Sequence, residues 1–447
     1  MSSLFSVAAA TVGGGHQARS GGYKMQRSVR LRSSASASFS RTPAGAGNRK
    51  TWTWSGWVKR GALGTTTLFD GGSTGPLCVL QFNSDQLRLY VTNAGITASE
   101  IPITTAVFRD PSAWYHVVCA VDTTQATLAN RVKLYVNGIE QTITGLNGTQ
   151  ITLNADLGIN RAIATYIGVY SFGTSQYFDG YLTEINFIDG QALTPSDFGQ
   201  TDPYTGVWSA RRYAGTYGTN GFYLNFSDNS AATAAAIGKD YSGNGNNWTP
   251  NNISVTAGAT YDSMLDVPTR WADGGNGRGN YAVLNPLDVV NGSATLSNGN
   301  LNFTGTNGVA ISSFGVTTGK WYAEASWTAI GATAASLRVY AISGVYAGYL
   351  SNGQRDINIT QSAYGATFTT NDVIGVAFDI DAGTVEFFKN GTSQGSISYS
   401  MTGSTWYIST NSRGTSGTNT GWLNFGQRPF TYTPPSGFRA LNTQNLP

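Results

Sequence analysis

Very few residues of this sequence could carry acid–base or nucleophilic chemistry. The only histidines are His16 and His116. His16 lies in a Gly-rich stretch without periodicity, and His116 lies in the apolar run Trp114–Asp122, where a strand histidine held by its neighbours is favoured over a base. A serine–histidine–aspartate triad and a histidine-rich metal site are therefore nearly excluded, because each needs a histidine within reach of its partners.

Paired carboxylates, which glycoside hydrolysis requires, are also missing from the sequence pattern. Two carboxylates on one face of a strand would appear in the sequence as Glu-x-Asp-x-x-Glu or a similar pattern, because side chains alternate between the faces. No such triplet occurs. Glu184 stands alone in its segment, and Asp379 and Asp381 have no glutamate on the same face. Asp381-Ala382-Gly383 is ordinary turn chemistry. The run Gly274–Gly279 follows no strand and opens no helix, so it is not a phosphate loop. We expect no catalytic residue and no enzymatic activity.

Calcium is the one metal that the residues leave open. It takes six to eight oxygens from carboxylates, carbonyls and amides on loops. Acidic and amide side chains do occur where strands of the first half end, but they do not reproduce one ligand motif. We therefore expect no cofactor, with calcium as the open alternative. The candidate ligands are Asp70, Asp85 and Asp122, together with Asp156 and Asn160.

Aromatic residues close to polar side chains could bind sugars. The loop Ser171–Tyr177 has the highest aromatic density and is the preferred surface. For each residue alone, structural packing is the competing interpretation. The candidates in the first half are Tyr170, Phe172 and Tyr177, beside Tyr166, and those in the second half are Tyr346, Tyr349, Arg355 and Trp406, beside Tyr364 and Tyr407.

The composition favours an all-β protein. Gly numbers 56 and Pro 13, only 11% of residues are charged, and turn-forming residues recur every ten or so positions. The net charge of +3 comes without a persistent basic stripe, so nucleic acid is not an expected partner. No run of 18 apolar residues predicts membrane insertion, and no leader segment is recognisable. Cys78 and Cys119 are expected to be reduced, buried thiols rather than a disulfide.

One supersecondary unit occurs twice. In WYHVVCAVDTTQATLANRVKLYVNG, from Trp114 to Gly138, an apolar strand precedes an alternating strand and an Asn-Gly turn, which accepts the positive φ that a type I′ hairpin needs. DVIGVAFDIDAGTVEFFKNG, from Asp372 to Gly391, repeats this order. We expect a flexible arm at 1–25, a sandwich at 26–203, an irregular connector at 204–270 and a second sandwich at 271–447.

Four segments of the first domain resemble the laminin-G/pentraxin branch of the concanavalin A-like lectin superfamily, in the family's order. The resemblance implies a jelly-roll sandwich of two antiparallel sheets that binds ligands on loops or a concave face, often sugars and sometimes with calcium. The segments are TWTWSGWVKR (Thr51–Arg60), WYHVVCAVD (Trp114–Asp122), VKLYVNGIE (Val132–Glu140) and IGVYSFGTSQYFDGYLTEINFIDGQALTPSDFG (Ile167–Gly199).

The second domain is similar to the SPRY (B30.2-like) family. Its matching pieces are GKWYAE, DVIGVAFD, VEFFKNG and NFGQRPF, which begin at Gly319, Asp372, Val385 and Asn424. This resemblance implies a second two-sheet sandwich that binds protein or another ligand through loops at one end, without chemistry. The expected fold is therefore all-β, with two concanavalin A-like jelly rolls in tandem joined by an irregular connector.

The tandem resembles virion proteins of tailed phages, above all in SRTPAGAGNRKTWTWSGWVKRG and IGKDYSGNGNNWTPNNISVTAGATYDSMLDVPT. This implies a non-enzymatic adhesin on the particle surface, as a tail fibre, head fibre or capsid decoration, assembled in the host cytoplasm. The arm would dock to other virion proteins, and a homo-oligomer, such as the trimer of a fibre, would bind host-surface glycan or protein multivalently. The alternatives are a structural cement protein without a host ligand and a glycan hydrolase with a cryptic site.

Overall fold

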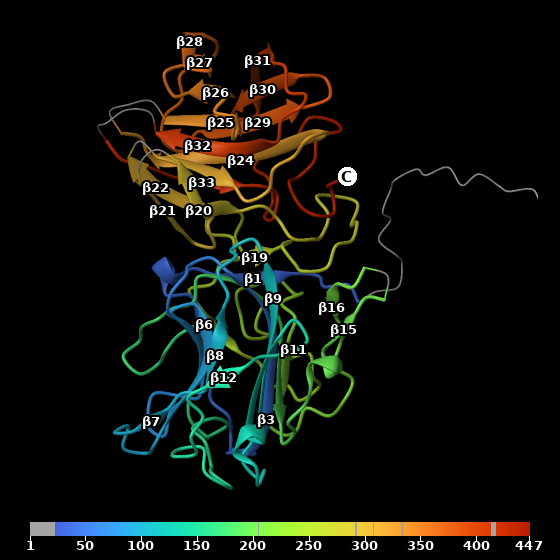
Figure 1. Ribbon diagram of the computed structural model, residues 1–447. Helices are drawn as coiled ribbons and strands as arrows, with labels where there is room; N and C mark the ends of the chain where they lie inside the picture. The colour runs from blue at the N-terminus through green and yellow to red at the C-terminus, as the bar shows by residue number, and fades with distance from the viewer. Residues whose placement is uncertain (1–22, 204, 291–292, 307, 332–334, 413–416) are drawn as a thin grey trace, which may run out of the picture.

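The computed structural model describes residues 23–447 except 204, 291–292, 307, 332–334 and 413–416. Two β-sandwiches follow one another along an elongated body (Figure 1). The helical elements of the described residues are the short 3-10 turns η1 (Ser33–Ala35), η2 (Leu128–Asn130) and η3 (Pro195–Asp197). The predicted all-β class and the tandem of sandwiches are confirmed. Nowhere in the described part of the chain is there a helix long and apolar enough to span a membrane.

The first sandwich consists of sheets A and B. The strands of sheet A are β1 (Ser28–Leu31), β3 (Thr51–Arg60), β9 (Trp114–Asp122), β10 (Val132–Val136), β11 (Ile139–Glu140), β14 (Gly180–Asp189), β17 (Phe222–Leu224) and β19 (Ser263–Met264). They lie in the order β11-β10-β9-β3-β14-β1-β19, with β17 also paired to β14.

The strands of sheet B are β2 (Ser38–Arg41), β4 (Thr66–Asp70), β5 (Cys78–Asn83), β6 (Gln86–Thr92), β7 (Ser99–Glu100), β8 (Ile103–Val107), β12 (Ile143–Thr144), β13 (Thr165–Ile167) and β18 (Thr249–Asn251). Their order is β12-β8-β6-β5-β4-β13-β2-β18, with β7 also paired to β6. The core between sheets A and B includes both cysteines, which are free and buried as expected.

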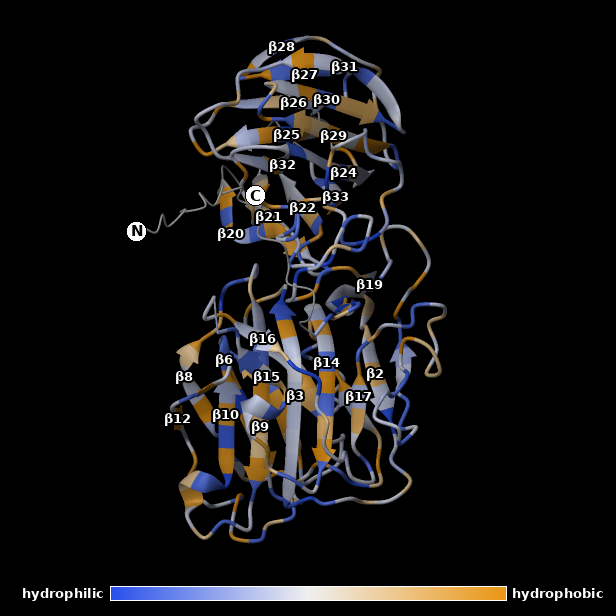
Figure 2. Ribbon diagram, turned by 90° about the vertical axis from the view of Figure 1, so that its right-hand side faces the viewer, coloured by the Kyte–Doolittle hydropathy of each residue, from blue (hydrophilic) through white to orange (hydrophobic). Residues whose placement is uncertain are grey.

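Strand alternation explains which side chains the first core receives. Trp52 and Trp54 of β3 are buried between the sheets, whereas Trp57 lies in a different cluster because it points to the other face. At the end of β10, Asn137 and Gly138 have φ values of 50° and 82°, as the predicted hairpin turn requires. Apolar segments are visible along β9 and β14 in Figure 2. Alternation along β3 therefore divides its tryptophans between two clusters.

The outer face of sheet A is covered by a later part of the chain. Val118 of β9 and Ile188 of β14 pack there against Phe198, Tyr213 and Tyr217. The short hairpin of β15 (Gly199–Thr201) and β16 (Trp208–Ala210) belongs to the same covering segment. This layer removes much of one sheet face from solvent, which leaves the outer face of sheet B as the alternative for ligands.

The stretch 204–270, expected to be an irregular connector, is built into the first sandwich. It supplies β17, β18 and β19, which pair with β14, β2 and β1 respectively. Phe226 and Trp248 are buried in the first core. The expectation failed because strands of two or three residues separated by long turns leave no periodicity in the sequence, so only their partners define them.

The second sandwich consists of sheets C and D. Sheet C contains β20 (Leu284–Val290), β23 (Val309–Ser312), β32 (Trp406–Ser412), β25 (Ala335–Ala341), β26 (Tyr346–Leu350), β27 (Gln354–Ile357) and β28 (Thr360–Ala363), in that order. Sheet D contains β21 (Ser293–Ser297), β22 (Asn302–Thr306), β33 (Asn419–Asn424), β24 (Lys320–Ala329), β29 (Val373–Asp379), β30 (Thr384–Lys389) and β31 (Thr392–Ser398), in that order.

The repeated unit is confirmed in sheet D. Strands β29 and β30 pair antiparallel, and Val385 and Phe387 are fully buried, as the alternation predicts. Asn390 and Gly391 form the closing turn with φ values of 48° and 78°. The same local pattern therefore produces the same hairpin in both sandwiches.

A buried ion pair of the first sandwich lies where the two sandwiches meet, and it contacts the second sandwich through Tyr281. Lys59 of β3 is fully buried, and its Nζ lies 2.8 Å from Asp266 Oδ2 and 2.7 Å from the carbonyl oxygen of Tyr281. Asp266 Oδ1 accepts from Trp114 Nε1 at 2.9 Å. Desolvation lowers the pKa of Lys59, and Asp266 opposes that change. The pair is stable because each buried charge has both its counterion and further hydrogen bonds.

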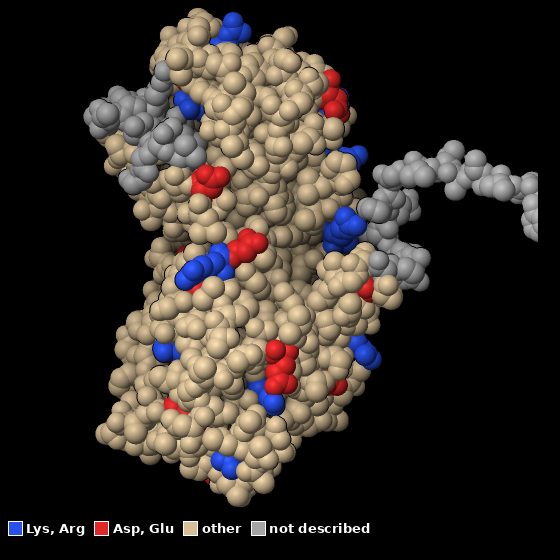
Figure 3. All heavy atoms as spheres, viewed as in Figure 1, with Lys and Arg blue, Asp and Glu red and all other residues tan. Residues whose placement is uncertain are grey.

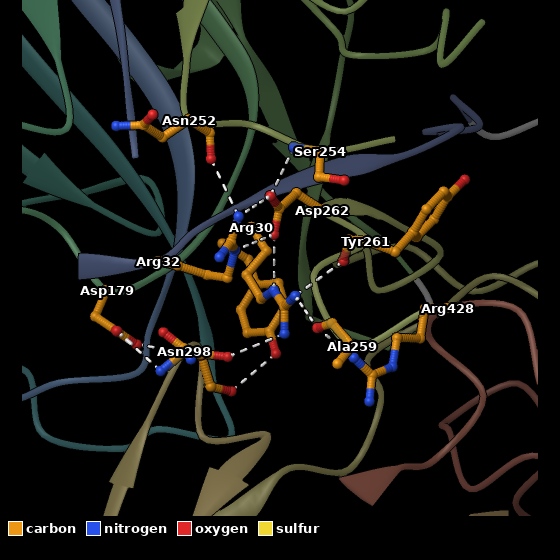
Figure 4. Close-up of polar contacts among 12 residues, drawn as sticks. Arg30, Arg32, Asp179, Asn252, Ser254, Ala259, Tyr261, Asp262, Asn298 and Arg428 are labelled. Carbon is orange, nitrogen blue, oxygen red and sulfur yellow. Dashed lines mark hydrogen bonds and ion pairs between the residues drawn. The ribbon is translucent and has the colours of Figure 1, made fainter. Parts of the chain in front are cut away.

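A second network lies beside it (Figure 4). Asp262 Oδ1 is 3.1 Å from Arg30 Nε and 2.9 Å from Arg32 Nε. Arg30 also donates to the carbonyl oxygen of Asn298 in the turn between β21 and β22. Asp179 accepts from the backbone N–H of Asn298 at 3.0 Å. The second sandwich is thus tied to the first through backbone groups as well as side chains.

Apolar residues complete the join. The core of the second sandwich continues without interruption into side chains of the first, including Met25 and Trp57. Met25 belongs to the predicted flexible arm, yet it is fully buried. Residues 1–22 of that arm lie outside the described residues.

Replacing Lys59 with methionine tests the join. Asp266 would then keep a buried charge without its counterion, and we expect the free energy of unfolding to fall by about 3–5 kcal/mol. Urea denaturation followed by tryptophan fluorescence measures the change.

The matched control is Lys133→Met. Lys133 pairs with Glu140 at 2.6 Å in the same sandwich, but the two side chains are 30% and 50% exposed. Its loss should cost less than about 1 kcal/mol, because solvent screens exposed pairs. Equal effects of the two substitutions would contradict a stabilising join.

Candidate binding face

The outer face of sheet B carries polar and aromatic side chains, since its strands alternate. In β6, Leu87 and Leu89 are buried in the core, whereas Arg88 and Tyr90 are partly exposed on the opposite face. Tyr166 of β13 is partly exposed and pairs in register with Asp70 of β4. Arg88, Tyr90 and Tyr166 are therefore accessible for contact with a polar ligand, whereas Asp70 is buried.

The predicted sugar-binding loop folds against this face. Tyr170 and Ser175 form an antiparallel bridge, with N–O distances of 3.0 and 3.1 Å. Asp70 Oδ2 accepts from Ser171 N at 2.7 Å and from Ser171 Oγ at 2.9 Å. Gly173 has a φ of 89°, a backbone conformation that favours glycine. These contacts fix the loop conformation before any ligand arrives.

The predicted loop residues differ in exposure. Phe172 is 46% exposed, and its ring centroid lies 6.2 Å from that of Tyr170. Tyr170 and Tyr177 are partly exposed. The three predicted residues of the first domain thus lie in one ordered loop with aromatic surface accessible to solvent. Their role in binding stays a prediction.

Arg88 and Tyr90 were not among the predicted residues. The guanidinium carbon of Arg88 lies 5.5 Å from the ring centroid of Tyr90. Tyr170 is a further neighbour that acts electrostatically on Arg88. The alternating pattern of Gln86–Thr92 could have identified both as outward residues, but not their distance from the loop, which depends on the sheet.

Three of the predicted residues of the second domain are buried in its core. Tyr349, Trp406 and Tyr346 are 0%, 1% and 6% exposed. Trp406 donates from Nε1 to the carbonyl oxygen of Met401 at 2.6 Å. The prediction that these three residues bind a sugar is therefore corrected, because an aromatic ring needs an exposed face to stack on a ligand. Arg355 is partly exposed, and its Nε donates to Ser362 Oγ at 2.8 Å.

The candidate calcium ligands do not form one site. Asp70 is held by Ser171 and by the N–H of Gly72, and desolvation raises its pKa. Asp85 accepts from Gly64 N at 2.6 Å and pairs with Arg60 and Arg109, each at 3.0 Å. Burial alone would raise the pKa of Asp85, but these donors lower it overall.

The carboxylate of Asp122 also accepts hydrogen bonds from protein groups. It accepts from Thr124 Oγ1 at 2.6 Å and from Gln125 Nε2 at 2.7 Å. Asn160 donates to Asp189 Oδ1 at 2.7 Å, and the Asp156 carbonyl oxygen accepts from Arg49. Among the residues that the structure describes, no three His, Cys, Asp or Glu side chains gather as a metal site. The carboxylates of Asp70, Asp85 and Asp122 therefore already accept hydrogen bonds from protein groups.

His116 has the structural role that the sequence favoured. Its Nδ1 accepts from Trp208 Nε1 at 3.0 Å, and its Nε2 lies 2.9 Å from Ser55 Oγ. Burial lowers the pKa of His116 to about 3. The ring is therefore neutral and holds the covering segment on sheet A.

Glu184 is the most perturbed carboxylate of the first sandwich. It lies at a bulge in β14 with a φ of 54°, and it accepts from the hydroxyls of Tyr23 at 2.8 Å and Tyr223 at 2.5 Å. Burial raises the pKa of Glu184 to about 7, although both tyrosine hydrogen bonds act to lower it. It is only 5% exposed, so a sugar cannot reach it.

We expect Glu184→Gln to change how stability depends on pH. Between pH 4.5 and 7 the folded protein binds a proton that the unfolded chain has lost, so rising pH destabilises the wild type. Glutamine does not titrate. As pH rises from 4.5 to 7, the free energy of unfolding of the variant should therefore increase by about 3 kcal/mol relative to that of the wild type. Unfolding curves at both pH limits measure it, and an unchanged difference would contradict a raised pKa.

Calcium should leave the melting temperature unchanged, because protein donors occupy the oxygens of Asp70, Asp85 and Asp122. Thermal unfolding in millimolar calcium and in excess chelator checks this. A calcium-dependent rise that disappears in one aspartate-to-asparagine variant would show that a site exists there.

The comparisons with known proteins agree with the two sandwiches. Residues 33–197 match the concanavalin A-like lectin/glucanases superfamily, and residues 313–410 match the SPRY domain family. No curated protein matches the chain. Each sandwich therefore has its own family match.

Similar solved structures have low identity. The native heptameric SAP-like pentraxin from Limulus polyphemus is 16% identical over 38% of this chain and 78% of its own, with a TM-score of 0.28. The SPRY domain of human HERC1 is 18% identical over 31% of this chain and 96% of its own, with a TM-score of 0.27.

Two further structures match in part. A candidate carbohydrate binding protein from Bacteroides ovatus ATCC 8483 is 18% identical over 52% of this chain and 60% of its own, with a TM-score of 0.33. Stonustoxin is 15% identical over 32% of this chain and 27% of its own, with a TM-score of 0.28. The match therefore spans about a quarter of that chain. TM-scores of 0.27 to 0.33 do not indicate a shared function. The two family matches show that the chain contains a concanavalin A-like domain followed by a SPRY domain.

Proposed function

We propose that this protein is a non-enzymatic adhesin of a phage virion that binds host-surface glycan or protein. The observation that carries the binding role is the ordered aromatic loop on the outer face of sheet B, where Phe172 is 46% exposed beside Tyr170. Exposed aromatic rings held by a rigid backbone suit the apolar faces of sugars at a low entropic cost.

Binding is favoured over hydrolysis, although the matched superfamily includes glucanases as well as lectins. Glu184 is enclosed by two tyrosines, and Asp379 pairs with Lys320 at 2.9 Å while its Oδ1 accepts from Ala382 N in a turn. Neither is positioned as one of two acids that flank a glycosidic bond. A cryptic glycan hydrolase is therefore the second alternative.

The virion context is supported by the sequence resemblance of the two segments 40–61 and 237–269. In the folded chain these segments contact one another through Arg41 and Asn246, and through the buried pair of Lys59 and Asp266. The two segments would thus stabilise the fold rather than contact the ligand. The main alternative is a cement protein that contacts only other virion proteins.

Many copies of the protein on one particle would give the particle avidity for the host surface. A shallow face with few anchoring rings binds weakly by itself, and several copies on one particle raise the effective concentration of the second contact. A homo-oligomer attached through residues 1–22 is part of this proposal. Antibody labelling of intact particles tests the location, and unlabelled particles would contradict it.

The double variant Tyr170→Ala/Phe172→Ala tests the binding role. We expect it to bind glycans on an array about tenfold more weakly than the wild type, because two stacking rings are lost. The control is Ile139→Ala, which removes an apolar side chain that is 67% exposed at the edge of sheet A. Equal binding by all three proteins would refute this face.

Two other results would favour the alternatives. Absence of binding to any glycan or host cell would favour the cement protein. Release of reducing ends from host polysaccharide by the wild type would favour the hydrolase.

A further inference from the structure

We infer that the outer face of sheet B selects acidic saccharides, and that Arg88 pairs with the carboxylate of the ligand. This inference rests on the proposed function, because it names the ligand class of the same face. It adds a residue that neither the loop nor the family matches indicate.

The position of Arg88 follows from the register of the sheet. Arg88 pairs with Gln81 in β5, which pairs with Thr67 in β4. Leu87 and Leu89 fill the core, so Arg88 must point to the outer face that carries the loop. The guanidinium carbon lies 5.5 Å from the Tyr90 ring centroid, and Tyr170 of the loop also acts electrostatically on Arg88.

Arg88 carries a charge that the fold does not neutralise. None of the ion pairs found among the described residues includes it. Burial lowers the pKa of Arg88, and the groups that oppose this are two tyrosines rather than a carboxylate. A guanidinium remains protonated in proteins, so a partly buried positive charge is left for an anionic ligand.

The orientation of Arg88 is fixed in advance. With the Gln81 amide turned to satisfy both groups, its oxygen lies 2.7 Å from Arg88 Nη2 and 3.1 Å from Nε. The Tyr90 ring, 5.5 Å away, supports the guanidinium plane. Gln81 takes Nε and Nη2, and among the described residues no hydrogen bond of Arg88 uses Nη1, which can therefore donate to a ligand carboxylate.

The chemistry around this charge favours a sugar acid over other anions. One arginine beside partly exposed tyrosines suits a single carboxylate on a ring whose C–H face can stack on Tyr170 or Phe172. A nucleic acid, a phosphorylated peptide or an anionic membrane would need several cations together. On the face shown in Figure 3, Lys and Arg are scattered and often lie beside Asp or Glu.

The test compares uronic-acid oligosaccharides with their methyl esters, which differ in charge but not in stereochemistry. The probes are hexamers of galacturonate, mannuronate and glucuronate, and calorimetry with the full chain gives each affinity. For at least one of them we expect the wild type to bind the acid about tenfold more tightly than the ester, and high salt should reduce the difference.

Arg88→Gln should remove this preference and keep the affinity for the ester. Arg88→Lys should retain only part of it, because lysine cannot form the fork. Lys133→Gln, an exposed cation on sheet A, should leave the preference unchanged. Equal melting temperatures of the wild type and Arg88→Gln exclude misfolding as the cause.

The possible failures are distinguishable. Equal binding of acids and esters, or a preference that survives Arg88→Gln, overturns the role of Arg88 and leaves the proposed adhesin intact. Binding of neutral glycans on the array without binding of any acid overturns the ligand class. Absence of binding to every saccharide overturns both the ligand class and the glycan-binding function.

Discussion

The buried charges between the two sandwiches constrain the rest of the molecule. Lys59 and Asp266 would each cost several kcal/mol if they were buried alone, so the fold must bring them together with their additional partners. Arg30, Arg32 and Asp262 repeat this requirement beside them. Because Lys59 also donates to the carbonyl oxygen of Tyr281 and Arg30 to that of Asn298, and because one apolar cluster includes side chains of both sandwiches, the two domains form one continuous packed body.

This constraint also decides which surfaces remain available. The chain between β14 and the join returns across sheet A, where His116 and the rings of Phe198 and Tyr213 hold it. The outer face of sheet B keeps its polar residues and its aromatic loop. The binding face is therefore defined as much by what covers the other sheet as by its own residues.

Perturbed carboxylates in this protein stabilise local structure. Glu184 is bound by tyrosine hydroxyls, and Glu324 accepts from the N–H groups of Thr431 and Tyr432 at 2.8 Å. Desolvation raises the pKa of both. Each is enclosed by its partners, so a raised pKa here marks a buried hydrogen-bonded acid rather than a catalytic one.

The all-β class, the repeated hairpin and the inward residues of β10 and β30 could be predicted from the residues alone, because alternation and Asn-Gly turns act locally. The sequence also located the aromatic loop. The burial of Tyr349 and Trp406, the pairing of Asp85 with arginines and the completion of the first sandwich by residues 205–270 became visible in the folded chain alone. Those outcomes depend on partners far apart in the chain, and a single sequence carries no record of which distant segments will meet.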